Sequence, residues 1–367
     1  MGKTMRAIGL MSGTSMDGID VALIETDGEN AVERRAARTV AYDAAFRAAL
    51  ARAIADARGL ADRAQRPGCL AEVERELTER HAAAVEQFLD RQDLRPADID
   101  VAGFHGHTVL HAPERRLTVQ LGDGAQLARA TGIDVVCDLR AADVAAGGQG
   151  APLAPVYHRA LAARLPQRPV VVLNIGGVAN ATWIGRDGTL LAFDTGPGNA
   201  LIDDWMARHS GRPLDADGAA AALGRVDENA LTALLSHTYF GRLPPKSLDR
   251  NAFSAKAVAH LSLEDGAATL TAFTAASIAK AREHFPEEPQ LWVVAGGGRR
   301  NKTLMAMLAG RVEAAVTPAE AAGMDGDAVE AEAWAYLAVR SLKALPITFP
   351  GTTGVPKPMT GGVLARA

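Results

Sequence analysis

Residues 9–18 read GLMSGTSMDG, a glycine-rich turn between two apolar segments, and this stretch decides the fold. We expect strands at residues 7–11 and 19–25, because the apolar side chains of the second segment alternate onto one face. The same order of strand, glycine-rich turn and strand returns at residues 170–184, where 174–180 read NIGGVAN. This repeat indicates an ancient duplication, with two related halves that face each other across a cleft.

Composition excludes several classes of protein. Of 367 residues, 48% are hydrophobic and 22% are charged, which is typical of a globular chain. The net charge of -4 and the lack of a basic block argue against nucleic acid as a partner. The longest apolar run, residues 333–339, is far shorter than the ~20 residues of a membrane helix. Cys69 and Cys137 are too few for a secreted disulfide framework, so we expect a reduced, cytoplasmic protein.

Strands and helices alternate along most of the chain, which predicts an α/β fold. Apolar residues recur at helical spacing within 70–92, and the segments 99–104, 133–137 and 170–173 are typical of strands. The back half is expected to be mostly helical, with a strand at residues 291–295.

Four turns place glycines and small polar residues directly after an apolar strand. Glycine lets backbone amides approach an anion, hydroxyl groups add donors, and Asp17 can hold a hydrated cation. One such turn would be an ordinary tight turn, but four in one chain indicate a nucleotide site. The residues expected at the nucleotide are Ser12, Gly13, Thr14, Ser15, Asp17, Gly18, Gly176, Gly177, Gly196, Gly198, Asn199, Gly296, Gly297, Gly298 and Asn301.

The sequence fits other site chemistries less well. The usual phosphate motifs GxxxxGK[ST] and GxGxxG with a following acid are absent. Residues 194–196 spell the aspartic-protease tripeptide, but that chemistry needs a second copy, which the chain lacks. His105 and His107 share one face of a strand, so zinc is an alternative, although no cysteine lies near them.

Four strings together resemble the anhydro-N-acetylmuramic acid kinase family of the actin-like ATPase and sugar-kinase superfamily. They are residues 9–20, 147–153, 174–180 and 193–199. The resemblance extends from residue 8 to residue 362.

This resemblance implies a two-domain actin-like fold, a duplicated ribonuclease H-like architecture with a nucleotide cleft between the domains. We expect domain I at residues 1–140 with 341–367, carrying the phosphate hairpin, and domain II at residues 141–340, carrying the catalytic aspartate and the adenosine-binding turn. The implied reaction opens the 1,6-anhydro ring of 1,6-anhydro-N-acetylmuramic acid with water and phosphorylates O6. ATP and Mg²⁺ are the implied cofactors, and N-acetylmuramic acid 6-phosphate and ADP the products, in peptidoglycan recycling. A homodimer is also implied.

The resemblance also assigns site residues. Asp194 matches the catalytic aspartate, which takes a proton from the water that attacks the anomeric carbon, and Glu330 is a second catalytic acid, near the sugar or its water. Asp17 would hold Mg²⁺ through water. The residues expected at the sugar are His105, Arg140, Gln149 and Asn174.

Several of these residues have a structural alternative. His105 is otherwise a structural histidine, and Arg140 otherwise holds its loop through backbone contacts. Glu330 shares a helical face with Trp334, where an acid is either paired or functional. The family usually has Gln at the position of His107, and residues 246–250 resemble a family stretch of the second domain.

Two other functions fit the same pattern. One is a kinase of another amino sugar that transfers phosphate without ring opening. The other is a non-catalytic, ATP-driven conformational module of the actin-like superfamily, which would hydrolyse ATP slowly and without sugar.

Overall fold

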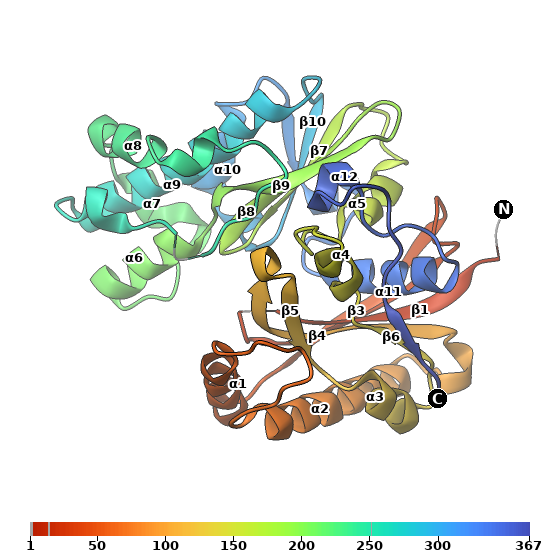
Figure 1. The fold of residues 1–367 in the computed structure, drawn as a ribbon. Coiled ribbons are helices and arrows are strands. Elements are labelled where there is room, and N and C mark those ends of the chain that lie inside the picture. Colours follow the sequence, from red (N-terminus) through yellow and green to blue (C-terminus); the bar gives the residue numbers. More distant parts are fainter. Residues whose placement is uncertain (1–2, 14, 251) are drawn as a thin grey trace. The chain divides into compact units, whose positions relative to one another are not determined.

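The computed structural model describes residues 3–13, 15–250 and 252–367, and the chain divides into two compact units (Figure 1). Unit 1 is Met1–Ala163 with Ala328–Ala367, and unit 2 is Arg164–Asp327. The boundaries therefore lie at residues 163 and 328 and not at the expected 140 and 340. The physical reason is packing: helices α4, α5 and α11 contact the sheet of unit 1 or one another.

Unit 1 is built on one sheet whose strand order is β12-β6-β4-β1-β2-β3, with β5 paired to β4. Strands β1, β2 and β3 form an antiparallel meander, and β4 runs parallel to β1 and β6 parallel to β4. The strands are β1 (Met5–Ser12), β2 (Gly18–Thr26), β3 (Val32–Ala41), β4 (Val101–Ala112), β5 (Leu117–Leu121), β6 (Val135–Cys137) and β12 (Val363–Ala365).

Helices cover both faces of this sheet. Helices α1, α2 and α3 pack on one face, where α2 buries an apolar stripe that includes Val73, Leu77 and Phe88. Helix α11 packs on β1 and β4, close enough that a Cβ at Gly9 would overlap the Ala331 carbonyl oxygen. Glycine is therefore required there. The helices are α1 (Ala44–Ala57), α2 (Leu70–Arg91), α3 (Gly124–Thr131), α4 (Ala141–Ala145), α5 (Pro155–Ala162), α11 (Val329–Leu342) and α12 (Pro350–Thr353).

Unit 2 repeats this architecture, and its strand order is β11-β10-β7-β8-β9. An antiparallel meander, β7-β8-β9, is again extended by strands parallel to its first strand. The α/β class and the duplication expected from residues 7–25 and 170–184 are thus confirmed. The strands are β7 (Val170–Ile175), β8 (Val178–Ile184), β9 (Leu190–Pro197), β10 (Leu291–Ala295) and β11 (Ala315–Pro318).

The helices of unit 2 gather around α9, which packs against α6, α7, α8 and α10 and against β9. Most of α9 is buried, so its side chains are small or apolar on nearly every face. The helices are α6 (Ala200–Ser210), α7 (Ala219–Leu223), α8 (Glu228–Leu235), α9 (Leu263–Lys280) and α10 (Lys302–Ala309). Within the described part of the chain, none of the helices has the length and apolar character needed to cross a membrane.

Candidate functional site

In unit 1, the turn that joins β1 to β2 is held by its own backbone. The Met16 amide donates to the Gly13 carbonyl at 3.0 Å, and the Ser15 hydroxyl donates to Asp17 Oδ1 at 2.8 Å. A Cβ at Gly18 would lie 2.5 Å from the Val40 carbonyl oxygen, so this position needs glycine. Asp17 is exposed and offers its carboxylate to solvent. Thr14, also expected at the nucleotide, lies outside the described residues.

Ser12 differs from the other hydroxyl residues of this turn. Its side chain is buried, accepts from the Tyr42 hydroxyl at 2.8 Å and lies 3.0 Å from His107 Nδ1. The Ser12 hydroxyl is therefore occupied inside the unit, and only its backbone is left for a phosphate.

Three of the predicted turns converge in unit 2, at the carboxyl ends of β7, β9 and β10. The Gly198 amide donates to the Gly177 carbonyl at 2.9 Å, and the Asn199 amide donates to Gly176 at 2.8 Å. The Asn199 side chain also donates to Ile175 at 3.1 Å. Helix α6 begins directly after this turn, so its first amides add to a region that favours anions.

The turn at residues 296–298 packs on the turn at residues 174–180. A Cβ at Gly296 would overlap Asn174 Oδ1, and a Cβ at Gly298 would overlap the Ile175 side chain. Asn301 is different, because it is buried and its side chain caps helix α10 by accepting from the Leu304 amide at 2.9 Å. The structure thus gives Asn301 a structural task beside the turn.

Asp194 lies on β9, half-buried, and is fixed on three sides. Its Oδ2 accepts from the Leu248 amide at 2.7 Å, its own amide donates to the Lys246 carbonyl at 3.0 Å, and its carbonyl accepts from the Tyr239 hydroxyl at 2.6 Å. Burial raises the pKa of Asp194 to about 7, although the Leu248 amide opposes this. A carboxyl group that titrates near neutral pH has the properties of a general base.

In unit 1, the structure brings together His105, Arg140, the Gln149 loop and Glu330. Arg140 donates to His105 Nε2 at 3.2 and 3.1 Å and to the Gly150 carbonyl at 2.7 Å. The centre of the Trp334 ring lies 4.5 Å from that of the His105 ring, with the two planes tilted by 32°, and 5.0 Å from the Arg140 guanidinium. Burial lowers the pKa of Arg140 to about 10, and the charge of Glu330 opposes this shift.

These contacts define the state of His105. Arg140 donates to Nε2, so Nε2 is the acceptor and the ring hydrogen lies on Nδ1. Burial, and next the charge of Arg140, hold the pKa of His105 well below its usual range. His105 is therefore neutral, and the contact from Arg140 to Gly150 shows that Arg140 also holds the loop through the backbone.

The Gln149 loop is anchored by residues that the sequence did not indicate. Asp143 accepts from the Gly150 amide and from the Thr353 hydroxyl, both at 2.6 Å, and the Gln149 amide donates to the Thr353 carbonyl at 2.7 Å. His111 Nε2 lies 2.9 Å from the Gln149 carbonyl.

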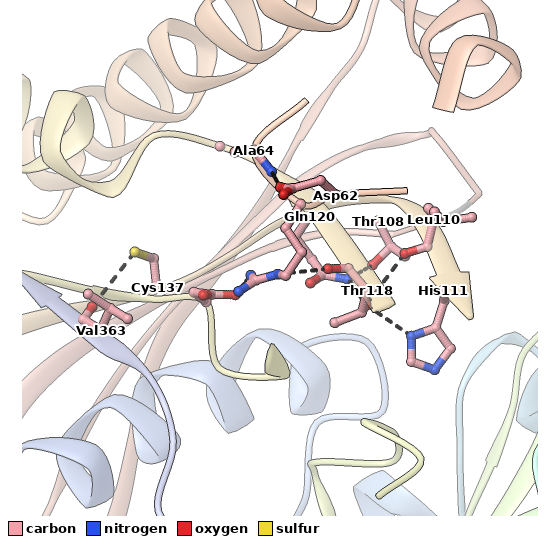
Figure 2. Close-up of polar contacts among 12 residues, drawn as sticks. Asp62, Ala64, Thr108, Leu110, His111, Thr118, Gln120, Cys137 and Val363 are labelled. Atoms are coloured by element: carbon pink, nitrogen blue, oxygen red, sulfur yellow. Dashed lines mark hydrogen bonds and ion pairs between the residues drawn. The ribbon is translucent and has the colours of Figure 1, made fainter. Parts of the chain in front are cut away.

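His111 is in turn held by polar side chains of β5. Figure 2 shows His111 Nδ1 beside the Thr118 hydroxyl, at 3.0 Å, and Gln120 donating to the same hydroxyl at 2.8 Å. This chain of hydrogen bonds connects the β4–β5 hairpin to the Gln149 loop.

Helix α11 carries two acids with different surroundings. Glu330, in the first turn, is exposed, whereas Glu332 is 1% exposed. Glu332 pairs with Arg34 at 2.9 Å and accepts from the Tyr157 hydroxyl at 2.8 Å. Glu332 is therefore a buried, paired acid of this helix that was not predicted, whereas the role of Glu330 near the sugar stays a prediction.

Metal chemistry has little support in the side chains. Among the described residues, no group of three or more His, Cys, Asp or Glu side chains could hold a metal ion, so the zinc alternative for His105 and His107 has no third ligand. Mg²⁺ needs only one or two carboxylates when phosphates and water complete its shell, and the exposed Asp17 fits that requirement.

Known proteins resemble this chain over nearly its whole length. The sequence model of the family described as anhydro-N-acetylmuramic acid kinase matches residues 5–367. A curated relative of that name from Methylobacterium nodulans is 58% identical and covers 99% of this chain and 100% of its own. Its counterpart from Azorhizobium caulinodans is 59% identical, with 98% and 99% covered.

Solved structures are more distant. Component A of (R)-2-hydroxyglutaryl-CoA dehydratase from Acidaminococcus fermentans is 12% identical, with a TM-score of 0.48, and covers 92% of this chain and 99% of its own. A ROK family glucokinase from Streptomyces griseus, in complex with glucose and AMPPNP, is 15% identical, with a TM-score of 0.40 and coverages of 91% and 99%. The extent and identity of the sequence matches show that the chain belongs to the anhydro-N-acetylmuramic acid kinase family.

Proposed function

We propose that this chain opens the 1,6-anhydro ring of 1,6-anhydro-N-acetylmuramic acid with water and phosphorylates O6 with ATP. The products are N-acetylmuramic acid 6-phosphate and ADP, in peptidoglycan recycling. Family membership supports the substrate, and one structural observation supports the chemistry: Asp194 is a fixed carboxyl group whose pKa lies near 7.

The state of Asp194 suggests how the water is activated. Oδ2 is occupied by the Leu248 amide, which leaves Oδ1 to accept the proton of the water. As that proton moves, the water oxygen bonds to C1 of the sugar and the bond between C1 and O6 breaks. The freed O6 attacks the γ-phosphorus, and the bond from that phosphorus to ADP breaks. The proton remains on Asp194 until it passes to solvent, so the steps balance without a further reactant.

We assign the sugar to the cluster in unit 1. The Arg140 guanidinium suits a carboxylate such as that of the lactyl group, and the exposed Glu330 can accept from sugar hydroxyls. The neutral His105 and the Gln149 loop would complete this side. Asn174 lies among the glycine turns of unit 2, next to Gly296, so we assign it to the nucleotide side and not to the sugar.

We assign ATP to the amide-rich turns. The turns that converge in unit 2 supply backbone donors, and the β1–β2 turn of unit 1 supplies further amides. Mg²⁺ would be held through water by Asp17, and when bound it neutralises phosphate charge. Phosphoryl transfer depends mainly on this positioning and neutralisation.

Labelled water tests the ring opening. In H₂¹⁸O, with rapid quenching, the product should carry one ¹⁸O at C1, and unlabelled product incubated alone measures spontaneous exchange at that carbon. Product without label above this control would indicate a kinase of another kind. ATP hydrolysis that does not depend on the anhydro sugar would indicate an ATP-driven module instead. Parallel assays with N-acetylmuramic acid and N-acetylglucosamine define which sugar is used.

We further propose a homodimer in the cytoplasm. The family resemblance supports the dimer, and the use of ATP as donor supports the location. Sedimentation equilibrium at micromolar concentration tests the dimer, and a purely monomeric species would contradict it. Cell fractionation with the chain expressed in its host tests the location.

A further inference from the structure

Ser12 is the last residue of β1, directly before the glycine-rich turn, and its side chain points into unit 1. It is 1% exposed, and its Oγ lies within hydrogen-bond distance of two groups, the Tyr42 hydroxyl at 2.8 Å and His107 Nδ1 at 3.0 Å. A hydroxyl group that is bonded on both sides holds a single orientation. The last residue before the turn is therefore fixed by one side chain of β4 and one that directly follows β3.

Tyr42 also holds the far end of the turn. It directly follows β3, is 5% exposed, and packs edge-on against Phe46 with the ring centres 4.9 Å apart. Its backbone amide donates to the Asp17 carbonyl at 2.9 Å, while its hydroxyl donates to Ser12. One residue thus bonds both ends of the turn, across the segment that includes the glycines.

His107 completes the arrangement from β4. A shift in the register between β1 and β4 places His107 opposite Ser12, and the ring is fully buried. Since the Tyr42 hydroxyl donates to Ser12, the hydrogen of Ser12 is available to His107 Nδ1. Burial lowers the pKa of His107 to about 4, so at neutral pH the ring is uncharged and Nδ1 can accept.

We propose that Ser12, Tyr42 and His107 form a brace that holds the β1–β2 turn in its ATP-binding shape, with His107 as a positioning residue. This inference rests on the proposed function, in which the turn binds ATP. The brace explains why the ring of His107 is turned toward Ser12, although His107 lies on β4, the strand that also contributes to the sugar cluster. His105, two residues earlier on β4, belongs to the sugar cluster, so β4 serves both groups.

Substitutions at His107 test the brace through ATP affinity. In His107→Leu the Ser12 hydroxyl loses its acceptor, and we expect the calorimetric Kd for ATP to rise about tenfold, as for one buried hydrogen bond. His107→Asn places an amide oxygen where Nδ1 was, and its Kd should stay within about threefold of the wild type. At saturating ATP and sugar, kcat should change little in either variant. A wild-type Kd in His107→Leu, or equal Kd values in the two variants, would overturn the proposal.

A double variant and a control separate the brace from a general loss of stability. Ser12→Ala with His107→Leu should weaken ATP binding no more than Ser12→Ala alone, because Ser12→Ala already removes the bond to His107 together with the bond to Tyr42. Additive losses would count against the brace. His158→Leu removes another buried histidine of unit 1, on α5, and should lower thermal stability without changing the Kd for ATP.

The wild-type protein gives a test that needs no substitution and no ATP. Nitrogen-15 spectra of labelled histidine should show His107 with its hydrogen on Nε2 and an accepting Nδ1. A hydrogen on Nδ1 would refute the brace as drawn. Failure of the wild-type chain to bind ATP would instead refute the proposed function, so the two failures are distinguishable.

Discussion

Replacing Asp194 with Asn is expected to stop the reaction and, above neutral pH, to stabilise the protein. Burial raises the pKa of Asp194 from its usual 3.8 to about 7, so the folded chain binds this proton more tightly than the unfolded chain. Stability is therefore lost as the pH rises from about 4 to about 7, and the loss is complete above that range. Asn stays neutral and keeps an oxygen for the Leu248 amide, so the variant avoids this loss.

The structure bounds the size of the gain. A shift of about three pH units corresponds to about 4 kcal/mol at the ordinary conversion of about 1.4 kcal/mol per unit. Asp194 is half-buried, so water screens part of its charge, and we expect about 2–4 kcal/mol at pH 8 and close to zero at pH 4. Turnover should fall by several orders of magnitude, because the general base must generate the nucleophile, while ATP still binds.

Urea unfolding between pH 4 and pH 8.5 measures this difference. Trp183, Trp205 and Trp292 all lie in unit 2, so tryptophan fluorescence reports mainly on the unit that contains Asp194. In the wild type, kcat/KM should rise with pH through about 7 as the carboxyl group ionises.

Asp187→Asn is the matched control, with the opposite sign. Asp187 accepts from the Thr189 amide at 2.9 Å and hydroxyl at 2.8 Å, and the amide bond foremost holds its pKa below the usual value. The ionised Asp187 carboxylate therefore stabilises the folded chain above about pH 4, and this stabilisation is lost below that pH. The Asn variant should have a lower free energy of unfolding at neutral pH and keep full activity. If Asp194→Asn were no more stable than the wild type at pH 8, or if its activity persisted, the reasoning about Asp194 would be wrong.

Three further substitutions test separate parts of the structure. Gly198→Ala should abolish ATP binding and lower the free energy of unfolding by about 2 kcal/mol or more, measured by calorimetry and urea, because its Cβ would overlap the Gly176 carbonyl oxygen. Glu332→Gln should cost about 1–3 kcal/mol in urea unfolding, since it leaves the Arg34 cation without its carboxylate. Arg140→Lys should raise KM for the sugar about tenfold or more with KM for ATP unchanged, because lysine cannot reproduce the planar fork.

Each of these variants has a control within the chain. Gly59→Ala places its Cβ in open space and should be silent. Glu79→Gln removes an exposed partner of Arg75, a pair that should contribute less than about 0.5 kcal/mol. Arg95→Lys changes an exposed arginine and should leave both KM values unchanged. A control that behaves like its test variant would remove the structural argument for that variant.

The sequence predicted the elements whose signals are local. The glycine turns, the strands on either side of them and the strand at residues 291–295 follow from short patterns, and all are present. Strand β3 was not predicted, because its sequence VERRAARTVA has three consecutive charged residues and places Arg34 and Arg38 on the same face as Val32 and Val40. Strand β11 is four residues long and only partly buried, so it left no pattern to detect.

The anchoring residues were not predictable, because their partners are distant in the sequence. Tyr42 is 30 residues from Ser12, and Asp143 is 210 residues from Thr353. Periodicity predicts which face of a helix or strand is buried, but it does not predict which side chains from other elements contact that face. Glu332 was missed for a related reason: every residue of 331–340 is buried, so an apolar stripe on this helix does not single out the acid that is paired inside it.

A carboxyl group that acts as a base near neutral pH must be poorly solvated. Its side chain would be better solvated if it rotated toward water, so the protein must fix its position. One amide, that of Leu248, offsets only part of the desolvation of Asp194, so the segment that carries this amide must itself be fixed. Lys246 provides the fixation. It is 9% exposed, its Nζ lies 3.2 Å from His284 Nε2, and it sits 4.9 Å from the Tyr239 ring, whose hydroxyl donates to the Asp194 carbonyl. The stretch at residues 246–250 thus acts on Asp194 through the backbone, which is why the types of its side chains alone gave no indication of its role.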